Sequence, residues 1–267
     1  MKEFFTRTLT ALVIIPIVYL AIQFLPLLVF SLFVYIIISR VAYEFINLCN
    51  PRLYSFPLIL AAGLVMGLSF ALEVPDLKLF MMAVIIGLGL FFLFSINRRE
   101  DLASFVRDMG IHFMVVFYIY FPLYFLVELK KAGANTLFFL ILVIIIGDSG
   151  AYFIGSWIGK RAIYPVASPN KTLAGLIAAI LTASLAGWLS LVIFPVAIKP
   201  WMAMISGGLI GLVSQLSDPI ESLFKRAVLK KDSGSILPGH GGFLDRLDSY
   251  IFCSPLLVFL VKYFWKL

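Results

Sequence analysis

The residues best suited to chemistry in this 267-residue chain lie together between positions 222 and 248. This segment contains three Asp, one His, five Lys or Arg and four Gly, whereas the whole chain is 62% hydrophobic and 13% charged. Ionisable groups close to hydrocarbon are costly and usually mark a functional site. Carboxylates next to cations and a glycine-rich turn are typical of a centre that binds a metal ion and phosphate groups.

A basic helix is expected at the start of this segment. The sequence DPIE at residues 218–221 has the pattern of a capping box, which predicts that a helix begins at Asp218 and runs from about 219 to 232. Lys225 and Arg226 lie opposite its apolar residues, so the helix is either an amphipathic element at the membrane surface or a phosphate-binding element, and the two interpretations are compatible. The apolar residues are Ile220, Leu223, Phe224, Ala227 and Val228.

A glycine-rich turn and two carboxylates follow. The sequence PGHGG at residues 238–242 is either a simple turn or a loop whose backbone approaches an anion closely, with His240 as a donor. Asp245 and Asp248 are three residues apart and would share one face of a helix. Carboxylates without a second His or Cys favour a hard cation such as Mg²⁺ over zinc.

Two more polar motifs precede this segment. Asp148 interrupts an apolar stretch, so its carboxylate must face protein or water and is either a hydrogen-bonded helix-packing residue or a site residue. The sequence SPNKT at residues 168–172 predicts a helix start, with Ser168 as the N-cap and Pro169 at the first position. Its polar side chains next to exposed backbone N–H groups would also suit a phosphate.

The elements that must hold these residues are membrane helices. A mean hydropathy of +1.06 and 15% aromatic residues exclude an ordinary soluble domain. We therefore expect an all-α, polytopic integral membrane protein, with an N-terminal scaffold at 1–130 and a catalytic region at 131–267. The nine apolar runs of roughly span length are 8–25, 27–48, 54–72, 79–96, 109–128, 136–157, 172–196, 201–217 and 250–266.

The distribution of basic residues predicts the orientation. With the N-terminus inside, nine spans place 14 Lys or Arg in inside segments and six in outside segments, and the motif loops face the cytoplasm. The net charge of +7 suits anionic lipid headgroups or a nucleotide. Nucleic acid is not expected as a partner, because no soluble basic domain fits between the spans.

The segment 222–248 resembles the signature of phosphatidate cytidylyltransferases, also called CDP-diacylglycerol synthases. The resemblance extends to residues 148–152, to Gly159-Lys160 and to residues 168–172, which together cover about the C-terminal half. Two positions depart from the family pattern: Ser217 stands where a Gly is usual, and Ala174 stands where a Glu is usual. The fixed positions, all filled, are Ser222, Lys225, Arg226, Lys231, Asp232, Gly234, Pro238, His240, Gly241, Gly242, Asp245, Arg246 and Asp248.

The resemblance implies an enzyme that converts CTP and phosphatidate from the bilayer into CDP-diacylglycerol and pyrophosphate, with Mg²⁺ as cofactor. The family's response to monovalent ions suggests K⁺ as a second cation. The expected metal ligands are Asp218 and Asp245, with Asp248 as a third and Asp148 in support. The other expected catalytic residues are Lys225, Arg226, His240 and Arg246, and the substrate-binding residues are Ser168, Asn170, Lys171, Thr172, Lys231, Gly239, Gly241 and Gly242.

Two other functions remain open at this point. A transporter could use Asp148 and the basic loops to move an anion, although the sequence shows neither inverted repeats nor polar motifs on both sides of the membrane. A cytidylyltransferase could instead act on another lipid phosphate, such as a polyprenyl or ether lipid. Whichever lipid phosphate the enzyme uses, membrane lipids are expected partners. The site would lie at the cell membrane and face the cytoplasm. The N-terminal helices could form the contact of a homodimer.

Overall fold

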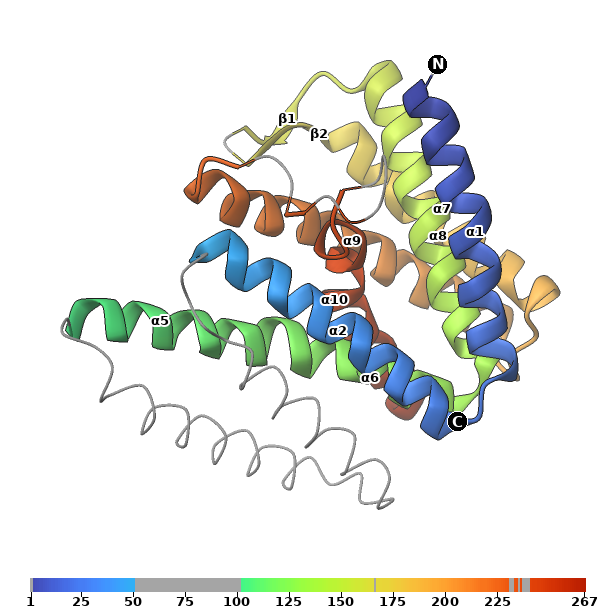
Figure 1. Cartoon of the computed structure of the whole chain (residues 1–267). Helices are drawn as coiled ribbons and strands as arrows, with labels where there is room; N and C mark the ends of the chain where they lie inside the picture. Colours follow the sequence, from blue (N-terminus) through green and yellow to red (C-terminus); the bar gives the residue numbers. More distant parts are fainter. Residues whose placement is uncertain (1, 51–101, 166, 231–232, 235, 237–240) are drawn as a thin grey trace. The chain divides into compact units, whose positions relative to one another are not determined.

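The computed structural model describes residues 2–50, 102–165, 167–230, 233–234, 236 and 241–267 (Figure 1). This part of the chain is mostly helical, which confirms the all-α prediction apart from one short hairpin. In chain order the elements are α1 (Lys2–Phe24), α2 (Leu27–Cys49), α5 (Leu102–Met114), η1 (Val115–Tyr120), α6 (Phe121–Ala132), α7 (Ala134–Ile158), β1 (Ala162–Tyr164), β2 (Ser168–Thr172), α8 (Leu173–Ile193), α9 (Pro200–Ala227), α10 (Leu244–Phe259) and η2 (Leu260–Trp265).

Several helices are long and apolar enough to cross a membrane, so the chain is a multi-pass membrane protein. Within the described residues there are five: Leu27–Cys49, Phe105–Ala132, Ala134–Ile158, Leu173–Ile193 and Leu244–Trp265. Thr8–Phe24 is apolar but shorter. The predicted spans 54–72 and 79–96 lie outside the described residues, and the predicted span 201–217 is part of α9, which is not among the five. Nine spans therefore stay a prediction.

The first structural unit comprises residues 1–121 together with 232–245. In it, α2 packs against η1 and α5. The fully buried side chains of Val41, Phe45 and Ile119 belong to its core, and the ring of Phe45 lies 6.0 Å from that of Tyr118. A hydrogen bond of 3.0 Å between the hydroxyls of Ser39 and Tyr120 adds a polar link between α2 and η1.

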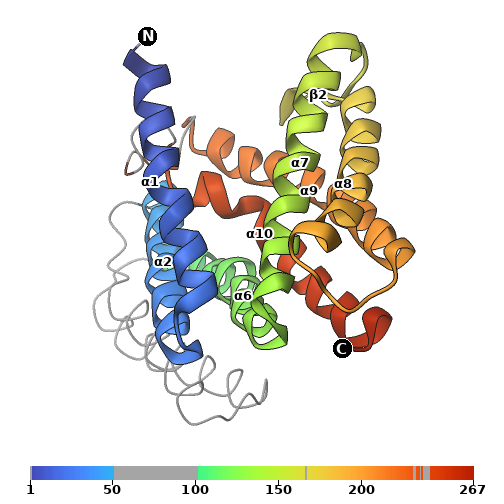
Figure 2. The ribbon, with the colours of Figure 1, turned by 90° about the vertical axis from the view of Figure 1, so that its right-hand side faces the viewer.

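The second unit comprises residues 122–231 together with 246–267, and its centre is the bundle of α7, α8 and α9. Figure 2 shows α7 and α8 side by side. Small residues allow α8 and α9 to approach closely: a Cβ on Gly187 would lie 2.2 Å from the Ala203 carbonyl oxygen, and one on Gly207 would lie 2.2 Å from that of Ala183. Such contacts are typical of membrane helices, which pack through small residues.

The hairpin β1–β2 carries the SPNKT motif and corrects the predicted helix start at Ser168. Residues 168–172 form a strand paired antiparallel with β1, with Ala162 opposite Thr172. The dihedral angle φ fixed by Pro169 also suits extended backbone at a sheet edge, so Ser-Pro did not require a helix. Helix α8 begins after Thr172, whose hydroxyl accepts a hydrogen bond of 3.2 Å from the Gly175 N–H.

The predicted start of a helix at Asp218 is also wrong, because α9 runs without a break from Pro200 to Ala227. Pro219 inside α9 removes a single backbone hydrogen bond, to the carbonyl of Gln215. In an apolar environment the remaining backbone groups still have to pair within the helix, which favours continuity over a new helix start. The separate interfacial helix at 219–232 is accordingly not confirmed, and α9 ends five residues earlier.

Candidate active site

Helix α9 has several polar side chains buried and several large apolar side chains exposed. Ser214, Gln215 and Glu221 are at most 3% exposed, whereas Leu212 and Leu223 are 38% and 49% exposed. This is the reverse of a soluble helix and suits a helix whose outer face contacts lipid. The buried face of α9 therefore forms a polar strip inside the second unit.

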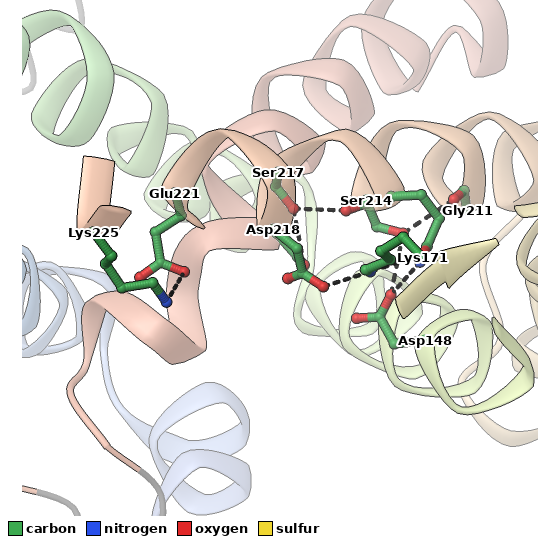
Figure 3. Close-up of polar contacts among 10 residues, drawn as sticks. Asp148, Lys171, Gly211, Ser214, Ser217, Asp218, Glu221 and Lys225 are labelled. Carbon is green, nitrogen blue, oxygen red and sulfur yellow. Dashed lines mark hydrogen bonds and ion pairs between the residues drawn. The ribbon is translucent and has the colours of Figure 1, made fainter. Parts of the chain in front are cut away.

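A chain of hydrogen bonds joins α7, β2 and α9 along this strip (Figure 3). The Gln215 side-chain amide donates to Asp148 Oδ1 over 2.7 Å, and its oxygen accepts a bond of 2.9 Å from Lys171 Nζ. Lys171 Nζ also forms an ion pair with Asp218 Oδ2. The Ser214 hydroxyl donates to Asp148 Oδ1 over 3.3 Å. These contacts bring together three predicted site residues, Asp148, Lys171 and Asp218.

The sequence reasoning missed Gln215, which joins Asp148 to Lys171, and Ser214, which donates to Asp148. Because Lys171 can only donate and a carboxylate can only accept, the two contacts fix the orientation of the Gln215 amide. One signal was available: Gln215 stands three residues before Asp218 in an apolar stretch, so the two share one face of a helix.

Asp218 also lies next to Asp248 of α10. Asp248 is 4% exposed, and its carboxyl forms a hydrogen bond with that of Asp218. The ammonium of Lys171, which pairs with Asp218, favours the charged form of its carboxylate. Behind it, the Ser217 hydroxyl donates to the Ser249 hydroxyl over 3.2 Å.

The basic residues at the end of α9 differ in their surroundings. Lys225 Nζ lies 3.2 Å from Glu221 Oε2, one turn away, and the Lys225 side chain is 14% exposed. Arg226 is exposed. Lys225 is thus held by a buried carboxylate, so its position is defined by α9 itself and not by a membrane surface alone.

The remaining residues of the SPNKT motif play different structural parts. Asn170 is exposed on β2, Ser168 is half-buried at the start of the strand, and Thr172 caps α8. Only Lys171 enters the buried network. Contacts of Ser168, Asn170 and Thr172 with CTP stay predictions.

The glycine-rich segment and Asp245 belong to the first unit. Asp245 Oδ2 accepts hydrogen bonds of 2.8 Å from the Gly242 N–H, 3.2 Å from the Ser233 N–H and 3.0 Å from the Ser233 hydroxyl. Gly241 has a φ of +80°, which favours glycine. The Gly242 N–H, expected to contact a triphosphate, is therefore bonded to Asp245 here. Arg246 is exposed.

The expected metal site is only partly described. Lys231, Gly239 and His240 lie outside the described residues. The relative positions of the two units are not determined, so the predicted meeting of Asp218 with Asp245 stays a prediction. In the part of the chain that the structure covers, no three Asp, Glu, His or Cys side chains are grouped closely enough to hold a metal by themselves.

Comparison with known proteins adds a decisive observation. The family model described as "Cytidylyltransferase family" matches residues 5–264, nearly the whole chain. The chain belongs to the cytidylyltransferase family. It is therefore a nucleotidyltransferase, and the membership confirms the resemblance drawn from residues 222–248. Because the match includes residues 5–130, the N-terminal helices are part of the family architecture and not an unrelated addition.

Individual members of the family show the same extent of similarity. The chain is 33% identical over 259 residues to a protein of Staphylococcus saprophyticus and 32% identical over 256 residues to one of Staphylococcus aureus. Each alignment covers 96% of this chain and 98% of the relative, and both relatives are named phosphatidate cytidylyltransferase. A protein of the same name from Staphylococcus epidermidis is 29% identical over 256 residues.

Proposed function

We propose that the chain is a phosphatidate cytidylyltransferase, which makes CDP-diacylglycerol and pyrophosphate from CTP and phosphatidate. The observation that carries the proposal is the hydrogen-bonded chain Asp148–Gln215–Lys171–Asp218 in an otherwise apolar bundle; Gln215 is buried, and the side chains of Lys171 and Asp218 are 22% and 43% exposed. Ionisable groups in a bundle of membrane helices are costly and usually mark a functional site. Full-length similarity to relatives of that name supports the choice of substrates.

The reaction needs no protein nucleophile. A phosphate oxygen of phosphatidate attacks the α-phosphorus of CTP, the bond between the α-phosphorus and the bridging oxygen breaks, and pyrophosphate leaves with that oxygen and its electron pair. Both reactants are anions, so catalysis consists mainly of neutralising and aligning phosphate groups. Lys171 and Lys225 supply positive charge from fixed positions, since each is held by a carboxylate of α9.

A divalent cation fits the residues around Asp218. Asp218 and Asp248 place two carboxyl groups within hydrogen-bonding distance, and Asp248 Oδ2 is buried without a hydrogen-bond partner among the described residues. Mg²⁺ is commonly held by one or two carboxylates together with phosphate oxygens of the substrate. Asp218 and Asp248 would hold the ion, which would neutralise charge on the reacting phosphates. Asp148 would act indirectly, because Gln215 and Ser214 already occupy its Oδ1. We also keep Asp245 as a proposed metal ligand and K⁺ as a proposed second cation.

The proposed location is the cell membrane, with the site open to the cytoplasm. Phosphatidate reaches the enzyme from the bilayer and CTP from the cytosol, so the site must be accessible to both. The basic residues that would contact phosphates, including Arg226 and Arg246, lie in segments that the positive-inside rule assigns to the cytoplasm.

A direct assay tests the proposal. Detergent-purified protein is incubated with CTP labelled at the α-phosphate, Mg²⁺ and phosphatidate in mixed micelles, and label in the lipid phase is compared with released pyrophosphate. We expect equal amounts of CDP-diacylglycerol and pyrophosphate. Parallel reactions contain a polyprenyl phosphate or an ether-linked phosphatidate. Labelling of either of these in preference to phosphatidate would replace the substrate, and no lipid labelling at all would contradict the proposed reaction.

A further inference from the structure

Glu44 of α2 is a buried carboxylate inside one of the candidate membrane spans. Its side chain is 2% exposed, and its Oε1 lies 3.3 Å from a guanidinium nitrogen of Arg40, one turn earlier. Ionisable residues at such positions are costly and are usually retained for function. The reaction proposed above assigns no role to Glu44.

The contacts of Glu44 lead to the glycine-rich segment, about 190 to 200 residues later in the sequence. Glu44 Oε2 accepts a hydrogen bond of 3.0 Å from the N–H of Leu244, the first residue of α10, and lies 3.5 Å from the Ser233 hydroxyl. The first N–H groups of a helix have no partner within the helix and need an external acceptor. Glu44 supplies that acceptor at the point where the glycine-rich segment ends.

Two nearby glycines leave room for the same carboxylate. A Cβ on Gly242 would lie 2.3 Å from the Ser233 hydroxyl oxygen and 2.5 Å from Glu44 Oε2, and one on Gly234 would lie 3.0 Å from Glu44 Oε1 and 3.1 Å from its Cδ. At both positions the Glu44 carboxylate therefore lies in space that a side chain would need. For Gly242 the expectation from the sequence was an approach of substrate phosphate.

Glu44 and Asp245 divide the hydrogen-bond donors of the segment between them. Asp245 accepts the N–H groups of Gly242 and Ser233, and Glu44 accepts that of Leu244. The two carboxylates thus accept the N–H groups of Ser233, Gly242 and Leu244, one carboxylate from within the signature and one from an N-terminal helix.

We propose that Glu44 is a positioning residue for residues 241–244, the described end of the glycine-rich segment, so that helix α2 orients a part of the chain that is expected to bind the triphosphate. This inference rests on the proposed function for its substrate, CTP. Residues that orient the groups contacting a ligand typically contribute about 10- to 100-fold in affinity or activity. We expect an effect of about that size on KM for CTP, with a much smaller effect on KM for phosphatidate.

The test uses paired changes on the two sides of one contact. Glu44→Asp keeps the charge next to Arg40 but shortens the side chain by one methylene, so the carboxylate no longer reaches the Leu244 N–H. Gly234→Ala adds a methyl group against the same carboxylate from the other side. Each single variant should raise KM for CTP by about 10-fold or more. The double variant should be less impaired than the product of the two single effects, because the shorter side chain makes room for the methyl group.

Ser39→Ala is the matched control. Ser39 lies on the same helix as Glu44, and its replacement by Ala removes the hydrogen bond to Tyr120 of η1. It should lower the melting temperature in detergent without changing KM for CTP. A merely structural role of Glu44 would give the same pattern in Glu44→Asp, with a lower melting temperature and unchanged KM, and would overturn the proposal. If Glu44→Asp does not fold, Gly234→Ala alone still tests the contact.

A second measurement is independent of activity. Amide hydrogen exchange should accelerate in residues 241–245 of Glu44→Asp and remain unchanged in that segment of Ser39→Ala. Faster exchange and a raised KM for CTP support the proposal. Unchanged exchange, or strictly additive effects of Glu44→Asp and Gly234→Ala, would overturn it. If the wild-type protein transfers no label from CTP to lipid, the proposed function fails, and the exchange result still decides whether Glu44 orders the segment.

Discussion

Gln215→Glu should destabilise the protein, and adding Asp148→Asn, which exchanges the amide and the carboxylate of this pair, should restore the stability without restoring the activity. Gln215 makes one hydrogen bond of 2.7 Å to the carboxylate of Asp148 and one of 2.9 Å to the ammonium of Lys171. Hydrogen bonds to charged groups contribute about 1.5–3 kcal/mol each, so loss of both in Gln215→Leu should cost up to about 3–6 kcal/mol. The actual loss of stability should lie near the lower value, because Lys171 keeps its ion pair with Asp218 and Asp148 keeps its hydrogen bond from Ser214.

Gln215→Glu separates the two halves of the network. The new carboxylate can still accept from Lys171 but would face Asp148 with a like charge, which disfavours the pair. Adding Asp148→Asn returns a donor to that contact, so the double variant has one amide, one carboxylate and the same total charge as the wild-type pair. The melting temperature in detergent should fall in Gln215→Glu and recover largely in the double variant.

Activity separates a structural Asp148 from a functional one. If the negative charge must lie on α7 for Lys171 to be placed correctly toward a phosphate, the double variant should keep a kcat/KM deficit of about 10-fold or more despite its recovered stability. The assay is CDP-diacylglycerol formation at several CTP concentrations, beside thermal unfolding of the same preparations. Recovery of both stability and kcat/KM to wild-type values would show that Asp148 only stabilises the bundle, and would refute the reasoning.

Three further predictions concern the same region and its orientation. Asp218→Asn preserves shape but removes charge, so it should lower kcat by about 100-fold or more and shift the Mg²⁺ dependence; an unchanged Mg²⁺ curve with normal turnover would remove Asp218 from the metal site. Lys225→Ala should raise KM for CTP or phosphatidate in a protein that still inserts, whereas a change confined to membrane localisation would favour the surface-anchor interpretation. In a Cys49→Ser background, an impermeant maleimide should label Lys199→Cys in intact cells and label Lys160→Cys after permeabilisation; the opposite pattern would reverse the topology.

The sequence predicted the helical class and several spans because apolar runs of membrane length have few alternatives. Its local errors share one cause. Ser168-Pro169 and Asp218-Pro219 both have the residue pattern of a helix start, yet the first lies in β2 and the second lies within α9. Proline fixes φ and removes one donor, which is compatible with a helix start, a sheet edge or a helix interior whose other backbone bonds remain. The packing of the rest of the chain selects among these three conformations, and a local residue pattern carries no information about that packing.

The candidate site illustrates the same limit at longer range. The motifs identified Asp148, Lys171 and Asp218 as separate candidates. Gln215 joins two of them, because it contacts Lys171, which is 44 positions away in the sequence, and Asp148, which is 67 positions away. Glu44 contacts a segment 189 or more positions away and carries no motif of its own. Chemistry-bearing residues are recognisable from their types, whereas the residues that orient them are defined by their contacts. In this chain those contacts come from α9 and α2, which makes Gln215 and Glu44 the informative positions for separating catalysis from support.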